Sequence, residues 1–339
     1  MTYAEAMVVG LIQGVTELFP VSSLGHNVLI PALIGGSWAQ DLSVSAPESP
    51  YLAFIVGLHV ATAAALILYF WRDWVRLVGG FVSSLRERRI ATADQRLAWM
   101  IIMATIPVGI AGLLLEHAFR VYFSKPVPTA IFLALNGVIL LGGERVVRRR
   151  AQSLPVPTAV PTAVSARADG PQAAQGDGRT AGPGELAEPA GPGEPTREGE
   201  LTRAVAADRR LSVMGFGRAL LIGTSQIAAL LPGISRDGVV TVTGMLRGIS
   251  REDAVRFSFL LSTPVILAAG VLKIPDLFGP LGHGIHGQVL AGSIVSFIGA
   301  YAALRFFMRY ISDSTRTLAP FATYCLIAGG AAFIYLSVH

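Results

Sequence analysis

Long apolar stretches recur along the chain, and short polar segments separate them. A helix needs about 20 residues, at about 1.5 Å each, to cross roughly 30 Å of hydrocarbon. Six stretches fit this requirement, at residues 51–71, 97–115, 128–143, 254–272, 288–307 and 318–338. The pattern therefore predicts six membrane-spanning helices.

Two further apolar stretches, residues 3–33 and 218–246, are interrupted in the middle by proline, glycine and polar residues. Such interruptions are typical of discontinuous or re-entrant helices, whose irregular backbone must be surrounded by protein. Pro20 removes a backbone donor and disfavours helix at the residue before it. We therefore expect the first stretch to turn at Pro20 and return as a second helix.

The composition supports a membrane protein. Of 339 residues, 52% are hydrophobic and 14% are charged, and the mean hydropathy is +0.56, well above the values of soluble domains. The first ten residues lack a basic segment and a cleavage pattern, so we expect no cleaved signal peptide. The single cysteine, Cys325, lies in an apolar stretch, which excludes an internal disulfide and a thiolate metal site.

The positive charge is concentrated in a few short segments. Six arginines lie between residues 71 and 97 and four lie at 145–150, whereas residues 116–127 hold one arginine and one lysine. By the positive-inside rule the arginine-rich segments are cytoplasmic and residues 116–127 lie outside. The net charge of +5 therefore reflects membrane topology and does not indicate a nucleic-acid partner.

Residues 151–200 have a different composition, with eight prolines, eight glycines, ten alanines and no aromatic residue. Such a segment cannot bury enough apolar surface to offset the entropy of ordering. We expect a disordered cytoplasmic insert at 151–210 and interpret it as a tolerated loop expansion. It divides the chain into a first repeat, 1–150, and a second repeat, 211–339, each with one hairpin and three transmembrane helices.

The two repeats resemble each other around their interrupted stretches. Gln13 precedes Ser22 by nine residues, and Gln226 precedes Ser235 by nine. The charge pattern makes the first hairpin enter from outside and the second from the cytoplasm. The predicted fold is an all-α polytopic membrane protein with an inverted-topology repeat. Two re-entrant helix hairpins meet near the midplane beside about six transmembrane helices.

The first interruption contains candidates for nucleophilic chemistry. A helix that begins after Pro20 places His26 at spacing i, i+4 from Ser22 and i, i+3 from Ser23. A serine within hydrogen-bond reach of a histidine is a minimal activated nucleophile. The free N–H groups at a helix N-terminus also favour an anion. Taken alone, either serine would be a helix cap.

The second interruption supplies a cation. Arg236 stays charged at any relevant pH, and its planar fork matches a phosphate group. A charged side chain at the bilayer centre costs at least about 2.5–3.5 kcal/mol, so Glu17 and Arg236 are functional candidates. The alternative is a structural ion pair between the repeats. Gln13, one turn before Glu17, would bind substrate or an ion, or serve in packing.

Four other polar residues have simpler interpretations. His59 is expected to be a core histidine whose hydrogen bonds are satisfied. His283 and His286 lie in a glycine-rich outer loop, and two histidines alone are a weak metal signal. Asp237 would orient Arg236 or cap the helix that follows.

Both interrupted segments resemble the signatures of a known family. QGVTELFPVSSLGH is similar to the (E/Q)xxxE and PxSSxGH elements of the undecaprenyl-diphosphate phosphatases of the bacitracin-resistance type. PGISRDGVVTVTGMLRGISREDAVRFSFLLSTP is similar to their PGxSRS element, Thr-rich helix and SRExAxxFSF segment. The resemblance covers both hairpins and the spans that follow them, which is most of the chain outside 151–210.

The resemblance implies hydrolysis of undecaprenyl diphosphate to undecaprenyl phosphate and inorganic phosphate, at the outer face of the bacterial cytoplasmic membrane. This reaction recycles the lipid carrier of cell-wall synthesis and confers bacitracin resistance. Carried onto this chain, Ser23 becomes the nucleophile, His26 the base and later the acid, and Arg236 the phosphate ligand. Glu17 becomes the acidic residue, which would orient His26 or hold a divalent cation, Mg²⁺ or Ca²⁺. The residues that would bind substrate are Gln13, Ser22, Gly233 and Ser235.

Three positions depart from the family pattern. Gln13 stands where many members have a first glutamate, which leaves one carboxylate fewer for a metal. Leu24 replaces a common threonine. Asp237 replaces the serine after the arginine and places a negative charge near the phosphates, where it could alter the rate or the metal dependence. The long insert is also unusual for the family.

Several alternatives stay open at this point. Direct attack by water, without a covalent serine, would give the same products. An inverted-repeat transporter or lipid flippase would explain the architecture without requiring serine, histidine and arginine together. A PAP2-like lipid phosphatase is disfavoured because its lysine/arginine motif and second histidine–aspartate motif are absent. The expected partners are a polyprenyl diphosphate and the lipid bilayer, and the sequence leaves a homodimer open.

Overall fold

The computed structural model describes residues 1–42, 50–123, 125–153, 197–279 and 282–338, and within these residues every regular element is a helix. The elements of the first half are α1 (Tyr3–Leu18), α2 (Ser23–Ile34), α3 (Gly36–Asp41), α4 (Pro50–Tyr69), α5 (Trp71–Glu87), α6 (Ala93–Phe123) and α7 (Pro126–Ser153). Those of the second half are α8 (Arg197–Ser212), α9 (Phe216–Thr224), the 3₁₀ helix η1 (Ser225–Leu230), α10 (Arg236–Leu246), α11 (Arg251–Phe278), α12 (His286–Ser312) and α13 (Ala319–Val338).

Five helices of the described chain are long and apolar enough to cross a membrane, namely α6, α7, α11, α12 and α13. They coincide with five of the six predicted stretches. The sixth, residues 51–71, is α4, which is followed after a bend of 85° by α5. A second bent pair, at 100°, joins α8 to α9 and η1, so that up to seven spans are present. The predicted all-α, multi-span architecture is confirmed.

Both interrupted stretches form hairpins of helices. In the first, α1 ends at Leu18 and α2 begins at Ser23, so the chain turns around Pro20 as predicted. A capping box between Thr2 and Glu5 fixes the start of α1. In the second hairpin, α9 tightens into η1, and α10 begins after the break with Ser235 as its N-cap.

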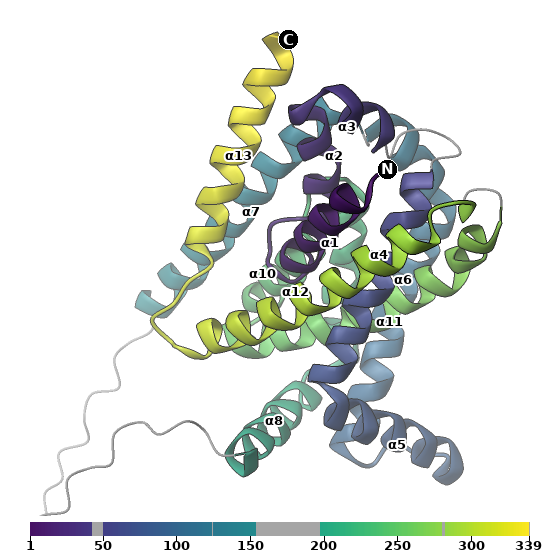
Figure 1. The fold of residues 1–339 in the computed structure, drawn as a ribbon. Coiled ribbons are helices and arrows are strands. Elements are labelled where there is room, and N and C mark those ends of the chain that lie inside the picture. Colours follow the sequence, from purple (N-terminus) through teal and green to yellow (C-terminus); the bar gives the residue numbers. More distant parts are fainter. Residues whose placement is uncertain (43–49, 124, 154–196, 280–281, 339) are drawn as a thin grey trace, which may run out of the picture.

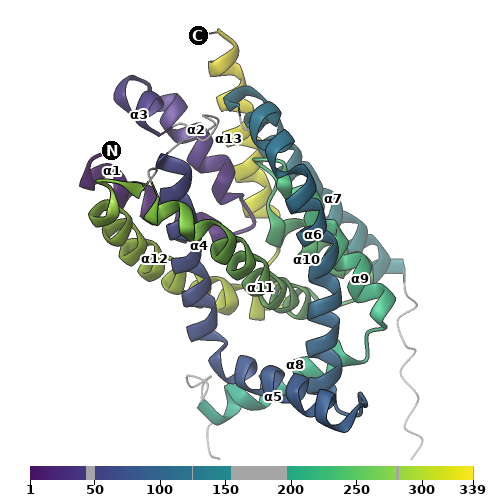
Figure 2. The ribbon, with the colours of Figure 1, turned by 90° about the vertical axis from the view of Figure 1, so that its right-hand side faces the viewer.

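Equivalent helices of the two halves pack in an exchanged manner (Figures 1 and 2). Helix α1 lies along α12, as α9 lies along α6, while α4 packs on α11 and α7 on α13. The contact between α1 and α12 is close, because a β-carbon at Gly14 would overlap the carbonyl of Ser296. Small residues are used in this way where membrane helices pack closely, since lipid provides no hydrophobic drive for association.

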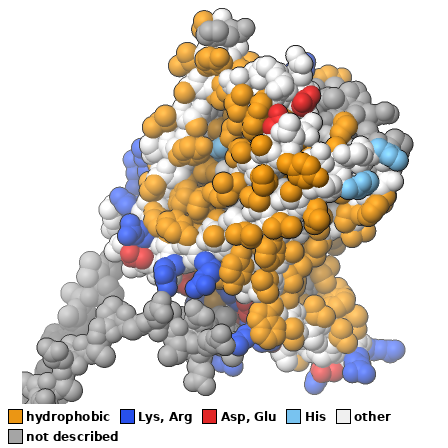
Figure 3. Space-filling model, in the orientation of Figure 1, with side chains coloured by type: hydrophobic (Ala, Val, Ile, Leu, Met, Phe, Trp, Pro, Cys, Tyr) orange, Lys and Arg blue, Asp and Glu red, His pale blue; other side chains and the backbone are white. Residues whose placement is uncertain are grey.

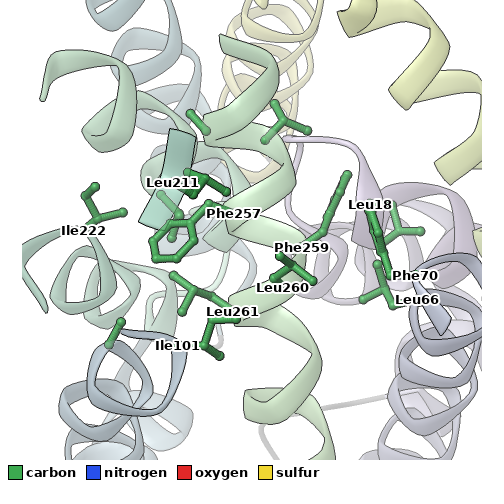
Figure 4. Close-up of a cluster of buried hydrophobic side chains, with 14 of the residues drawn as sticks. Leu18, Leu66, Phe70, Ile101, Leu211, Ile222, Phe257, Phe259, Leu260 and Leu261 are labelled. Atoms are coloured by element: carbon green, nitrogen blue, oxygen red, sulfur yellow. The ribbon is translucent and has the colours of Figure 1, made fainter. Parts of the chain in front are cut away.

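The main apolar cluster lies beside the second hairpin and joins α4, α6 and α11 (Figure 4). Phe70, Phe257 and Phe259 are buried there with Leu260 and Leu261 of α11. Aromatic contacts extend the cluster, with the ring centroids of Phe259 and Phe307 6.1 Å apart. Close packing of these side chains fixes α11 as a central helix on which both halves are assembled.

An ion-pair cluster holds the lower end of the molecule together. Arg256 of α11 contacts Asp73 of α5 at 2.9 Å and Asp208 of α8 at 3.0 Å, and all three side chains are buried. Arg76 of α5 bonds to the same two aspartates. Figure 3 shows further basic side chains along this end, below the broad apolar surface.

The arginine-rich segment after α4 is mostly helix α5 rather than loop. One face of α5 exposes an apolar stripe with alternating spacings of four and three residues, Trp71, Val75, Val78, Val82 and Leu85. Its other face buries Leu77 and Gly80. A helix with such a stripe, lying nearly perpendicular to a neighbouring span, is typical of the membrane interface.

The boundaries predicted for the disordered insert, 151–210, need correction at both ends. Helix α7 continues to Ser153, and α8 already begins at Arg197. The second boundary was missed because much of the anchoring of α8 comes from charge: Arg210 bonds Asp253 through two contacts of 2.7 Å, and Asp208 is held by Arg256. The helix also buries Leu211 in the main apolar cluster. The prediction for residues 154–196 falls outside the described residues.

Candidate active site

The tips of the two hairpins touch each other. Ser22 caps α2, and its hydroxyl accepts from the N–H groups of Gly25 and Gly233, both at 3.2 Å. Gly233 has φ +109°, and a β-carbon there would overlap the carbonyl of Thr129. Only glycine fits this conformation and this space. Ser22 therefore joins the two repeats, and its hydroxyl is occupied by backbone donors.

Asn136 of α7 links the same two tips from a third helix. Its amide nitrogen donates to the carbonyl of Pro20 at 2.9 Å, and its amide oxygen accepts from the N–H of Ser235 at 3.0 Å. The side chain is fully buried. Pro20 lies in the first interruption and Ser235 in the second, so one side chain fixes the position of both. Asn136 was not among the predicted site residues, because it lies in an ordinary spanning stretch.

Glu17 is the centre of the polar contacts. Its Oε1 accepts from Nη2 of Arg236 at 2.6 Å, and its Oε2 accepts from Nε2 of Gln13 at 3.0 Å and from the hydroxyl of Ser23. Asn27 in turn donates to Gln13 at 2.6 Å. The fold thus brings a carboxylate, a serine and an arginine from both repeats into direct contact.

His26 is placed differently from expectation. Its Nδ1 contacts the carbonyl of Ser22 at 2.7 Å, and its Nε2 contacts the hydroxyl of Tyr324 at 2.7 Å. The ring stacks on that of Tyr324, with centroids 5.7 Å apart. The predicted hydrogen bond from His26 to a serine hydroxyl is therefore wrong for this state, because the Ser22 hydroxyl caps the hairpin tips and the Ser23 hydroxyl turns to Glu17.

A cavity of about 140 Å³ opens beside Glu17, Ser23 and Arg236. A water molecule occupies about 30 Å³ of liquid, so the space is sufficient for a phosphoryl group and a few waters. Two buried polar atoms at this cavity have no hydrogen-bond partner, Nε of Arg236 and Oε1 of Gln226. The other lining residues are Ser22, Leu24, His59, Val108, Ala229, Leu230, Ile234, Ser235 and Val265.

Two polar lining residues were not among the predicted site residues. Gln226 was noted only as the counterpart of Gln13 in the second repeat, and that equivalence was the signal that could have selected it. His59 was interpreted as a core histidine, yet its Nε2 lies 3.5 Å from Oε2 of Glu17. Spacing along the chain does not relate His59 to the hairpins, so only the fold places it there.

Asp237, which replaces the serine of the family pattern, does not line the cavity. Its Oδ1 accepts from the hydroxyls of Ser258 and Ser262, both at 2.6 Å. Both serines belong to α11. The carboxylate is thus turned toward α11 and away from the cavity.

The residues present fit a divalent cation only in part. Among the described residues there is no group of three or more histidine, cysteine, aspartate or glutamate side chains. The cavity offers a carboxylate, Glu17, and the unpartnered amide oxygen of Gln226. Hard cations take oxygen ligands and need few from the protein when phosphates supply the rest.

A larger cavity of about 540 Å³ lies between α1 and α12, and its lining consists of apolar residues such as Leu11, Phe19 and Phe306. It offers no group for phosphate, so the smaller polar cavity is the candidate active site. There, a hydroxyl hydrogen-bonded to a carboxylate lies beside a partly buried arginine with an unused donor. This is an arrangement suited to nucleophilic attack on an anionic phosphorus centre.

Comparison with known proteins agrees with this geometry. The family model described as bacitracin resistance protein BacA matches residues 6–164 and 197–331. The chain is 57% identical over 339 residues to the undecaprenyl-diphosphatase of Mycolicibacterium paratuberculosis, which covers 100% of this chain and 99% of the relative. It is 51% identical to undecaprenyl-diphosphatase 1 of Frankia casuarinae over 368 residues, 99% of each chain, and 36% identical to undecaprenyl-diphosphatase 2 of Chromobacterium violaceum over 338 residues, again 99% of each. With both signature hairpins in place and full-length relatives of this kind, the chain belongs to the BacA family of bacitracin resistance proteins.

Proposed function

We propose that this multi-pass membrane protein hydrolyses undecaprenyl diphosphate to undecaprenyl phosphate and inorganic phosphate, and thereby confers bacitracin resistance. The observation that carries the proposal is the set of contacts around Glu17, which joins the Ser23 hydroxyl and the Arg236 guanidinium at one cavity. The names of the full-length relatives supply the identity of the substrate.

Arg236 binds the terminal phosphate. Its Nε is buried and unpartnered at the cavity, while its Nη2 is paired with Glu17. Charge-assisted hydrogen bonds from arginine to phosphate are frequently bidentate, so an arriving phosphate competes with Glu17 for the same guanidinium. The N–H groups at the start of α10 add donors at the same place.

Ser23 is the nucleophile and Glu17 is its base. As the Ser23 oxygen bonds to the terminal phosphorus, its proton passes to Oε2 of Glu17, the atom it already contacts. The bond from that phosphorus to the bridging oxygen breaks, and undecaprenyl phosphate leaves with the electron pair. Water then attacks the phosphoserine, and the bond from phosphorus to the serine oxygen breaks. Glu17 returns its proton to that oxygen, and both protons of the water leave with inorganic phosphate.

His26 has an indirect place in this mechanism. The contacts favour Glu17 over His26 as the base, because both ring nitrogens of His26 are bonded to Ser22 and Tyr324. The ring fixes the first turn of α2, which presents Ser23 to Glu17. Direct attack by water remains the alternative, with Glu17 as its base.

Two finer features belong to the same proposal. We propose that the cavity opens toward the outer leaflet; the positive-inside rule assigns the arginine-rich end of the molecule to the cytoplasm. Mg²⁺ or Ca²⁺ would be held by Glu17 and Gln226 together with phosphate oxygens, and would neutralise charge on the diphosphate.

Phosphate release from a polyprenyl diphosphate by the purified protein tests the function. We expect Ser23→Ala and Arg236→Ala to lower turnover by at least about 100-fold, as expected for loss of a nucleophile or a charged transition-state donor. Ser337→Ala and Arg89→Ala are matched controls on exposed positions and should retain activity. Near-normal turnover in both site variants would rule out the assigned roles. An inactive wild type that moves lipid across liposomes would instead identify a flippase.

A further inference from the structure

His59 faces the catalytic carboxylate from a helix that belongs to neither hairpin. It lies on α4, and its Nε2 is 3.5 Å from Oε2 of Glu17, the same oxygen that accepts from Ser23. Its side chain is 27% exposed and lines the cavity. From this arrangement we propose that His59 is a positioning residue, which holds Glu17 in place for proton transfer from Ser23.

The protonation of the ring follows from its other contact. Nδ1 of His59 lies 2.9 Å from the carbonyl of Ile55, one turn back on α4. A carbonyl only accepts, so Nδ1 carries a proton and the ring is held by its own helix. Nε2 then faces a carboxylate oxygen, and two lone pairs would repel each other there. The contact is attractive when Nε2 carries a proton, and at 3.5 Å it has the length of an ion pair rather than of a hydrogen bond.

The need for such a partner arises when substrate binds. In the free protein, Glu17 is held mainly by Arg236 at 2.6 Å. A terminal phosphate that engages the same guanidinium weakens this contact at the moment when Glu17 must be aligned with Ser23. Gln13 still donates to Oε2, but it is neutral. Among the polar side chains that line the cavity, His59 is the remaining one that, with its ring protonated, can donate a charge-assisted hydrogen bond to Glu17.

The charged groups around His59 support this single role. Among the described residues lining the cavity, the charged side chains are Glu17 from α1 and Arg236 from α10, whereas α6 and α11 contribute Val108 and Val265. Arg236 is already assigned to the terminal phosphate. Glu17 is therefore the group with which His59 interacts, and its effect on the reaction must pass through that carboxylate.

Steady-state kinetics of His59 variants test this inference, which rests on the proposed function. His59→Leu keeps a similar volume but removes the donor, and we expect kcat to fall roughly 10- to 100-fold, the range for a hydrogen bond to a charged group. KM should stay within about threefold, because the phosphate ligand Arg236 is untouched. His59→Gln restores an N–H donor without the positive charge, so its kcat should lie between those of His59→Leu and wild type. A purely packing role would not separate leucine from glutamine.

Controls separate the role of His59 from the phosphatase assignment. His283→Leu and His283→Gln make the same changes on an exposed loop and should leave kcat unaltered. If His59→Leu fails to fold, His59→Ala assayed with and without added imidazole replaces it, and imidazole should restore turnover. Unchanged kcat in His59→Leu, a loss confined to KM, or no rescue by glutamine or imidazole would overturn the inference while leaving the phosphatase assignment intact. An inactive wild type would instead defeat the proposed function.

Discussion

At the scale of single residues, the site depends on side chains that stabilise the fold and also contribute to the proposed chemistry. Glu17 accepts from Gln13, Ser23 and Arg236, and this explains how a carboxylate is tolerated inside the membrane protein. The structural ion pair considered for Glu17 and Arg236 is present, but the unused Nε of Arg236 leaves it able to bind an anion. A structural ion pair between Glu17 and Arg236 is therefore compatible with phosphate binding by Arg236.

Asn136 provides a prediction at this scale. Replacing it by leucine removes the partners of the Pro20 carbonyl and of the Ser235 N–H, both of which are buried. An unsatisfied buried group costs about 1–3 kcal/mol, so Asn136→Leu should lower the free energy of unfolding by roughly 2–5 kcal/mol. Turnover should also fall, because the hairpin tips lose their common support.

Unfolding in mixed detergent micelles, with phosphate release at a temperature where the variant is folded, measures both effects. Asn136→Asp is the informative comparison, because it keeps the acceptor for Ser235 and loses the donor to Pro20. A stability equal to wild type in Asn136→Leu would contradict the role assigned to this side chain.

At the scale of elements, two kinds of connection hold the helices. Within the membrane, α1 approaches α12 closely through glycines, and α11 packs through aromatic and leucine side chains. At the arginine-rich end, charge pairs join α5, α8 and α11. The chain thus enters the second repeat through α8. This helix is held by ion pairs although it lacks a strong apolar face.

Arg256 is the key residue of that charged connection. Arg256→Leu would leave Asp73 and Asp208 buried with fewer cationic partners, and removal of one member of a buried pair costs about 3–5 kcal/mol. We expect a corresponding loss in the free energy of unfolding, with protease sensitivity appearing first around α8. Arg89→Leu removes an exposed pair with Glu87 and should cost at most about 1 kcal/mol. Equal stability of the two variants would show that the cluster contributes nothing.

At the scale of the whole molecule, the two repeats are incomplete without each other. The first supplies Glu17 and Ser23, the second supplies Arg236, and α4 adds His59. The exchanged packing of α1 on α12 and α9 on α6 keeps the hairpin tips in contact. Active-site assembly is therefore a property of the complete fold.

Membrane orientation gives a prediction at this scale. The positive-inside rule places the end of α7 in the cytoplasm and the loop before α12 outside. A cysteine at exposed position Gln152 should react with an impermeant maleimide only after the cells are opened, and one at His283 should react in intact cells. Cys325 is buried and is the only native cysteine, so the background should be low. The reverse pattern of labelling would invert the topology and move the site to the cytoplasmic face.

Most elements of this protein, and most residues of its candidate site, could be predicted from local features of the sequence. Apolar length specified the spans, Pro20 specified a turn, and the pattern of glutamate, serine and arginine in two interrupted segments indicated a phosphate site. These features are local: they depend on helix length, backbone donors and charge at positions close together in the chain.

The tertiary fold sets which side chains meet. It directed the Ser23 hydroxyl to Glu17 rather than to His26, turned Asp237 toward Ser258 and Ser262, and brought Asn136 and His59 to the hairpins. A helical spacing specifies a shared face but not the competing partners beyond that helix. Contacts between α1, α4, α7 and α10 depend on how closely packed helices cross, and that is settled by the packing of the whole chain.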